Sequence, residues 1–171
     1  MQRESIHSSA EPVSDGDLDE YLTFSLGDEG YGVDILRVLE IRGWETVTRI
    51  PNTPAYVKGV LNLRGTIVPV FDLRLRIGMP IRAYEKETVV VVLRVNTSDG
   101  EKNIGIVVDG VSDVLSAGVA AIQRAPDFGS RLNTEFIVGM VSAGEKMIML
   151  LDVDRLVPDP GNGTQQQTGA A

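Results

Sequence analysis

Carboxylates are the residues of this chain whose type could most readily support chemistry. The chain has no cysteine and one histidine, His7, so thiol nucleophiles, cysteine zinc sites and a Ser-His-Asp triad lack the residues that they need. Five acidic residues stand near predicted turns or strand ends: Glu40, Asp72, Asp109, Asp113 and Asp152. A pair of carboxylates with different pKa values could act as acid and base. We favour a structural interpretation instead, because an internal duplication explains several of these acids as turn or strand-end residues that occur twice.

Ion and nucleotide motifs are incomplete in this sequence. Asp15, Asp17 and Asp19 have the spacing that begins a calcium loop, but the Gly and the bidentate Glu that the loop requires are replaced. The phosphate-binding pattern GxxxxGK[ST] does not occur. We therefore expect no catalytic residues, no metal and no cofactor. The alternative that stays open is a small hydrolase that uses Glu40 or Asp113 with a divalent ion.

Charge and hydropathy restrict the class of partner. The chain has 24 acidic and 16 basic residues and a net charge of −8, which is unsuited to a nucleic-acid backbone. Its longest apolar runs, at 89–93 and 147–151, are far shorter than the roughly 20 residues of a membrane helix. The first residues, MQRESIHSSAEPVSDGD, contain no apolar export signal. We expect a cytoplasmic protein that neither inserts into a membrane nor binds nucleic acid.

The apolar pattern mostly has the period of β-strands. We expect disordered tails at 1–19 and 159–171, which are poor in apolar residues, and a folded domain at 20–158. Short helices are predicted after Pro54, at 72–77 and at 152–157. Strands are predicted at 22–26, 36–41, 60–63, 66–71, 88–95, 104–108, 111–115, 136–141 and 147–151.

The chain also resembles itself. Tyr56, Gly59 and Asp72 recur, at a constant shift of 80, as Phe136, Gly139 and Asp152, and YGV at 31–33 recurs as IGI at 104–106. This repetition predicts two similar halves, roughly 20–85 and 86–158. Each half has the length of about five short strands, which suits a small closed barrel without exposed edges. The predicted fold class is all-β with a few short helices.

One segment has the features of a binding surface. KGVLNLRGTIVPVFD, at 58–72, places Arg64 and two glycines between consecutive strands. Glycine allows a close backbone approach, and a guanidinium suits a partner's carboxylate. An arginine that pairs within the fold is an equally good interpretation. The valine run at 89–93 is apolar on both strand faces, so one face could meet the other half or a partner.

The motifs YGVDILRVLEI, KGVLNLRGTIVPVFDLR and NIGIVVDGVSDVL closely resemble those of CheW, the family of bacterial chemotaxis coupling proteins. The resemblance covers nearly all of 20–157. It implies two intertwined, five-stranded SH3-like barrels without catalytic activity. It also implies a function, which is to link the cytoplasmic tips of chemoreceptors to the histidine kinase CheA. A coupling protein of a non-flagellar array, for surface motility or biofilm control, is the alternative within the same fold.

The resemblance also implies which residues bind. In the family a receptor hairpin lies in a hydrophobic groove between the barrels, and the matching positions are Val38, Glu40, Gly59, Arg64, Val89 and Val114. Contacts with the regulatory domain of CheA, or with other copies of the chain in rings, are implied for Gly65 and for Phe128 in the APDF loop.

Overall fold

The structure, a computed structural model, describes residues 18–124 and 134–158 of the chain. These residues form ten strands, one short α-helix and four short 3-10 helices. In chain order the elements are β1 (Leu18–Leu26), β2 (Glu29–Asp34), η2 (Ile35–Arg37), β3 (Val38–Gly43), β4 (Val57–Leu63), β5 (Thr66–Asp72), α1 (Leu73–Arg76), β6 (Val89–Thr97), β7 (Gly100–Val108), β8 (Gly110–Gly118), η3 (Val119–Ala121), η4 (Thr134–Phe136), β9 (Ile137–Ala143), β10 (Lys146–Leu151) and η5 (Val153–Leu156).

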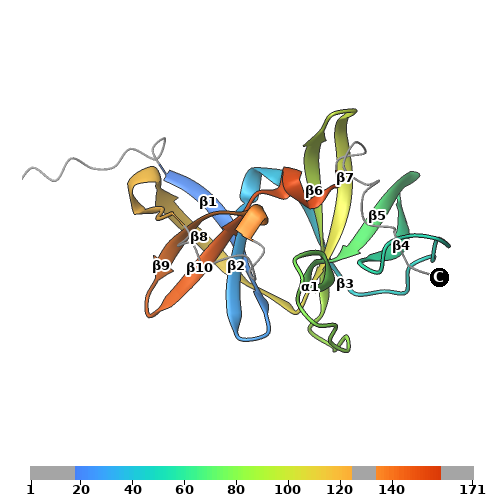
Figure 1. Cartoon of the computed structure of the whole chain (residues 1–171), viewed down its shortest axis with the longest axis horizontal. Coiled ribbons are helices and arrows are strands. Elements are labelled where there is room, and N and C mark those ends of the chain that lie inside the picture. The colour runs from blue at the N-terminus through green and yellow to red at the C-terminus, as the bar shows by residue number, and fades with distance from the viewer. Residues whose placement is uncertain (1–17, 125–133, 159–171) are drawn as a thin grey trace, which may run out of the picture.

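The strands form two curled five-stranded sheets that lie side by side (Figure 1). The first barrel has the strand order β8-β1-β2-β10-β9, and the second has the order β3-β6-β7-β5-β4. An isolated bridge joins the two ends of each sheet: Thr48, after β3, pairs with Val60 on β4, and Gln123, after β8, pairs with Met140 on β9. The predicted fold class, all-β with two similar five-stranded SH3-like barrels, is confirmed.

Several observed elements differ from the predicted ones, among them η3 and η4, which were not predicted, and β1, which begins at Leu18. The strand β2 was not predicted, because Gly30 and Gly32 lower the strand propensity of its sequence. Residues 36–37, the start of the strand predicted at 36–41, belong instead to the 3-10 helix η2, whose first turn is capped by the Asp34 carboxylate. The helix predicted after Pro54 was wrong, since that segment is a turn that leads into β4. The predicted short helices at 72–77 and 152–157 are confirmed as α1 and η5.

The duplication is visible in the strand register. Val70 of β5 pairs in parallel with Gly105 of β7, and the equivalent Leu150 of β10 pairs in parallel with Gly32 of β2. The bulged antiparallel pairs β3–β6 and β8–β1 correspond in the same way. We call β1–β5 with α1 the first half and β6–β10 with η5 the second half. Each barrel contains two strands of one half and three of the other.

Short connections explain this exchange of strands. In the first barrel β8 runs antiparallel to β1 and hence parallel to β2. If β3 took the place of β8, the chain would have to return along the whole length of β2, roughly 20 Å. The three residues of η2 reach only about 11 Å, and the corresponding link between β7 and β8 is the single residue Asp109. The third strand of each half must therefore enter the other barrel.

The apolar core has three parts, and the largest lies between the barrels. The interior of the second barrel is lined by Leu61, Val68, Val70, Val90, Val92 and Val107, and that of the first by Ala117, Val141, Ile148 and Leu150. A cluster of 17 buried residues, which we call the inter-barrel core, includes Phe24 and Val33 of the first barrel and Val91 and Leu93 of the second. The valine run of β6 thus serves two cores, because alternate side chains point to opposite faces.

An ion-pair cluster centred on Asp109 lies where the chain passes from β7 to β8. The Arg74 guanidinium donates two hydrogen bonds to the Asp109 carboxylate, one of them 3.0 Å long, and the Gly27 amide donates another of 2.6 Å. Arg82 lies 3.3 Å from the same carboxylate. Burial alone would raise the pKa of Asp109, but the hydrogen bonds from Arg74 and Gly27 hold it below its ordinary value.

Replacing Asp109 with asparagine should lower the free energy of unfolding at pH 7 by roughly 2–3 kcal/mol, because it leaves the buried Arg74 cation unpaired. A lowered folded-state pKa contributes stability above the unfolded pKa of about 4, and this stability is lost as the pH falls through the folded value. Urea unfolding at pH 7 and at acid pH should therefore show the wild type and Asp109→Asn converging in acid.

The matched control is Asp99→Asn, whose side chain is 65% exposed and which should change little at either pH. A constant difference between wild type and Asp109→Asn across this pH range would contradict the prediction.

Candidate functional site

Val38 and Val89 lie on the face of the second barrel that continues the inter-barrel core. Val38 on β3 pairs with Leu93 of β6, and both Val38 and Val89 pack against that core while staying half-buried. Directly opposed residues of an antiparallel pair point to the same face, so Ile41, which pairs with the core residue Val91, also points that way. Ile41 is 45% exposed.

Val114 occupies on the first barrel the place that Ile41 occupies on the second. It lies on β8 opposite Leu22, and Val111 lies opposite Phe24, both of which belong to the inter-barrel core. Val114 is 47% exposed. Both barrels therefore expose branched apolar side chains at the rim of the inter-barrel core, on β3 and on β8.

Sequence reasoning missed Ile41 and Val111 as members of these two rims. The signal that could have found them is the shift of 73, which relates Val38 to Val111 and Ile41 to Val114. The shift alone does not reveal the faces, because each strand pair contains a bulge, and a bulge changes which residues share a face.

Glu40 and Arg64 are brought together on the opposite face of β3. Glu40 pairs with Val92, whose side chain points into the second barrel. Its carboxylate lies 3.7 Å from the Arg64 guanidinium and 3.8 Å from that of Arg42. Because β3 and the β4–β5 hairpin lie at opposite ends of the sheet order, the Glu40–Arg64 ion pair lies across the closure of the second barrel.

The backbone of the β4–β5 hairpin displays Arg64. Arg64 and Gly65 both have positive φ, 52° and 89°, and form the two-residue turn, with the Gly65 amide donating to the Asn62 side chain. This geometry leaves the Arg64 side chain 87% exposed with its guanidinium beside Glu40. Gly65 is exposed at the tip of the same hairpin, so the predicted kinase contact lies next to a predicted receptor contact.

Gly59 is buried on β4, the first strand of this hairpin. Its φ is 148°, and a side chain there would overlap the carbonyl oxygen of Thr48, which accepts a hydrogen bond from Val60. The position requires glycine because the segment after β3 crosses directly over it. Gly59 therefore shapes the surface by letting the Thr48 segment pass close to β4.

We expect Gly59→Ala to lower the free energy of unfolding by roughly 1–3 kcal/mol, from the positive φ and from the overlap with Thr48. Gly43→Ala is the matched control, since a methyl group at Gly43 meets no atom within 4 Å. Chemical denaturation of both variants measures the difference. Equal stability of the two variants would show that the Thr48 segment moves aside without cost.

The candidate acids lie at structural positions. Asp72 and Asp152 accept backbone hydrogen bonds at the starts of α1 and η5, which confirms their interpretation as turn residues. Asp72 also accepts a 2.6 Å hydrogen bond from the Tyr84 hydroxyl, and burial together with this bond raises the pKa of Tyr84. The Asp113 carboxylate accepts a hydrogen bond from the backbone N–H of its neighbour Val114, on an exposed part of β8.

Further observations concern the rest of the predicted site. Phe128 lies outside the described residues. Within 18–124 and 134–158, no group of three or more acidic or histidine side chains is placed to hold a metal ion. In the same residues no helix has the length and apolarity required to span a bilayer.

The candidate site consists of two apolar rims at the inter-barrel core and a charged hairpin at the closure of the second barrel.

Comparison with known proteins gives concordant matches. A family model described as CheW-like domain matches residues 20–160. The chain is 50% identical over 138 residues to the chemotaxis protein CheW of Klebsiella aerogenes, with 81% of both chains covered. It is 30% identical over 147 residues to the protein FrzA of Myxococcus xanthus, covering 81% of this chain and 84% of FrzA. The crystal structure of the scaffolding protein TtCheW from Thermoanaerobacter tengcongensis matches with a TM-score of 0.74 and 31% identity, covering 84% of this chain and 94% of TtCheW.

Proposed function

This chain belongs to the CheW-like domain family, and we propose that it is a chemotaxis scaffold that couples chemoreceptor tips to the histidine kinase CheA without catalysing a reaction. The observation that carries the proposal is the match to chemotaxis CheW proteins across the folded part of the chain. The geometry supports it, since the described residues present apolar and charged surface to a partner.

The two rims suit an amphipathic helical partner. Ile41 and Val114 are large apolar side chains that the fold leaves nearly half exposed, although each adjoins a buried core. A receptor helix with an apolar stripe would cover them and extend the inter-barrel core into the complex. Val38 and Val89 would form the half-buried floor beside the rim on β3.

The charged hairpin would set the orientation of the receptor. Arg64 is held beside Glu40 in a pair that remains open to solvent, so its free donors can reach a carboxylate or a carbonyl of the partner. Charged groups around an apolar contact fix register and speed association more than they add affinity. Gly65, at the tip of this hairpin, is proposed to contact the kinase, and Phe128 is proposed to do so from outside the described residues.

Co-sedimentation with receptor fragments, with CheA and with both together tests the proposal. We expect the chain to sediment with each partner alone and to retain more of each when both are present, because two modest interfaces reinforce one another. No added sedimentation with either partner would overturn the proposal.

Val114→Asp, with Val119→Asp as its matched control, tests the rim itself. Val119 is 76% exposed and lies beyond the end of β8, so the same charge there should leave receptor binding intact. In the complex, the receptor would bury the carboxylate at position 114 without a partner, which should weaken receptor binding about tenfold or more.

A second candidate is the coupling protein of a non-flagellar array, which the similarity to FrzA favours. The chemistry of the site would be the same and only the receptors would differ. Sedimentation with receptor fragments from each array of the source organism separates the two candidates.

A further inference from the structure

The charges at the contact between the two halves are sorted by half. The first half supplies three cations, Arg37, Arg74 and Arg76. The second half supplies the acceptors, which are the carboxylates of Asp109 and Asp154 and the carbonyl oxygen of Leu156. The halves are equivalent in fold, so this division is not imposed by the backbone.

The first contact joins α1 to the link between β7 and β8. Arg74, whose side chain is 10% exposed, holds Asp109 with two hydrogen bonds. Asp109 in turn accepts from the Gly27 amide in the turn between β1 and β2. The links β2–β3 and β7–β8, where the chain passes from one barrel to the other, are its two crossovers. This contact fixes the second crossover to both barrels.

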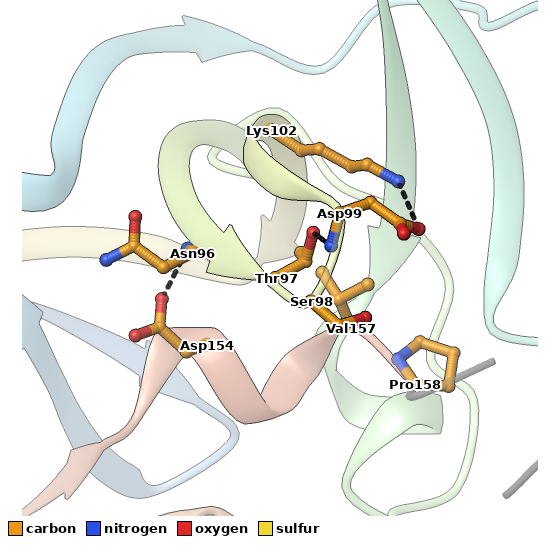
Figure 2. Close-up of a pocket in the computed structure, with 8 residues that line it drawn as sticks. All are labelled: Asn96, Thr97, Ser98, Asp99, Lys102, Asp154, Val157 and Pro158. Carbon is orange, nitrogen blue, oxygen red and sulfur yellow. Dashed lines mark hydrogen bonds and ion pairs between the residues drawn. The ribbon is translucent and has the colours of Figure 1, made fainter. Parts of the chain in front are cut away.

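The second contact joins η5 to the link between β2 and β3. Arg37 donates two hydrogen bonds, of 2.9 and 3.1 Å, to Asp154, and a third of 3.3 Å to the carbonyl oxygen of Arg94. Asp154 also accepts a 2.8 Å hydrogen bond from the backbone N–H of Asn96, as Figure 2 shows. It is the counterpart of the first contact, because the helical turn after the fifth strand of one half meets the crossover of the other.

The polarity of the two contacts is opposite. Arg74 is the second residue of α1 and Asp154 is the second residue of η5, and they are separated by the repeat distance of 80. At one contact the helical turn is cationic and the crossover is anionic, while at the other the signs are exchanged.

A third contact lies between the equivalent aromatic residues Tyr56 and Phe136. The Arg76 guanidinium stands over both rings, 4.9 and 4.6 Å from their centroids, and its Nε donates to the Leu156 carbonyl at 2.6 Å. The residue of the second half that corresponds to Arg76 is Leu156 itself, which is fully buried. Two first halves would bring two such arginines together.

We propose that these contacts specify the pairing of a first half with a second half and disfavour the pairing of like halves from two copies of the chain. If two first halves paired with the same geometry, Arg37 of one would meet Arg74 of the other. If two second halves paired, Asp109 would meet Asp154. Both like pairings bring buried or half-buried charges of one sign together, whereas unlike pairing satisfies every one of them. The apolar inter-barrel core carries no such preference, because equivalent strands supply it from both halves.

Exchanging charges tests the proposal on the full chain. In Arg37→Asp/Asp109→Arg, like charges meet at both contacts within one chain, but two copies that pair like half with like half regain opposite charges at both. In Arg37→Asp/Asp154→Arg, opposite charges meet within one chain and also between like halves of two copies. The charges then do not discriminate, and the pairing within one chain should persist because it needs no second copy. Both variants exchange one arginine and one aspartate and keep the net charge of −8.

Each variant is unfolded in urea, refolded at low and high protein concentration, and measured by light scattering. We expect Arg37→Asp/Asp109→Arg to shift toward twice the wild-type mass as concentration rises and to unfold at lower urea than Arg37→Asp/Asp154→Arg, which keeps the wild-type mass. The wild-type mass at every concentration for Arg37→Asp/Asp109→Arg, or the same shift in both variants, overturns the proposal. If circular dichroism shows Arg37→Asp/Asp109→Arg unfolded, Arg37→Asp alone, at the more exposed contact, is compared with Arg37→Asp/Asp154→Arg by urea unfolding. Arg37→Asp should unfold at lower urea, because Asp154 then meets a like charge within the chain, and equal unfolding midpoints overturn the proposal.

Discussion

Reversing the charge of Arg64 with glutamate should reduce receptor binding roughly tenfold or more while leaving the fold intact. The side chain is 87% exposed and makes no contact with a core, so the fold loses only a weak surface ion pair. Binding should weaken for two reasons. The receptor no longer finds the Arg64 cation, and the new carboxylate repels Glu40 at the closure of the second barrel. Sedimentation with a receptor fragment measures the change, and circular dichroism verifies folding.

Lys146→Glu is the matched control for Arg64→Glu. Lys146 is an exposed cation at the β9–β10 hairpin, which is the copy of the Arg64 hairpin in the first barrel. Its reversal should leave receptor binding near the wild-type level. Normal sedimentation by a folded Arg64→Glu chain, or equal losses in both variants, would contradict the role given to Arg64.

Replacing Phe136 with alanine should lower the free energy of unfolding by about 3–5 kcal/mol. Phe136 is 1% exposed in the inter-barrel core, and its ring stacks under the Arg76 guanidinium. Truncation leaves a cavity at the junction of the two barrels and removes one face of the site that holds Arg76. Because strands of both halves contribute to each barrel, the two barrels should unfold in a single transition.

Urea denaturation followed by circular dichroism and by the fluorescence of Trp44 measures this effect. Trp44 is the chain's one tryptophan and packs against the interior of the second barrel, whereas Phe136 adjoins the first, so agreement of the two signals reports joint unfolding. Val138→Ala, at a 52% exposed position on β9, should change stability by less than about 0.5 kcal/mol. Separate transitions for the two signals, or a loss below about 1 kcal/mol in Phe136→Ala, would contradict the prediction.

Local sequence pattern was a good guide where a strand is strongly apolar or where a residue type has one common use. The predicted strand 66–71 is β5 nearly to the residue, and the predicted helical turn at 72–77 contains α1 with Asp72 as its cap. It failed where glycine is required for packing. Gly32 of β2 faces the Leu150 side chain of β10, a close approach between residues 118 positions apart, and no local pattern reports it.

The functional residues show the same division. The predicted importance of Arg64 rests on its motif, and the structure supplies the reason for its exposure, a two-residue turn with positive φ. The grouping of Val38 with Ile41, and of Val111 with Val114, depends on a bulge in the pairing of β3 with β6 and of β8 with β1. A bulge is a property of two strands together, so the spacing within one strand misassigns the face.

The sequence by itself determined the all-β class and the absence of thiol chemistry, because periodicity and composition can be read along one chain. Its motifs carried the internal repetition and the family resemblance. Only the tertiary structure decided which strands of each half enter which barrel, that the largest core lies between the barrels, and that arginines of one half meet carboxylates of the other. Those features depend on contacts between residues far apart in the chain, where linker length, register and the sign of a distant charge act together.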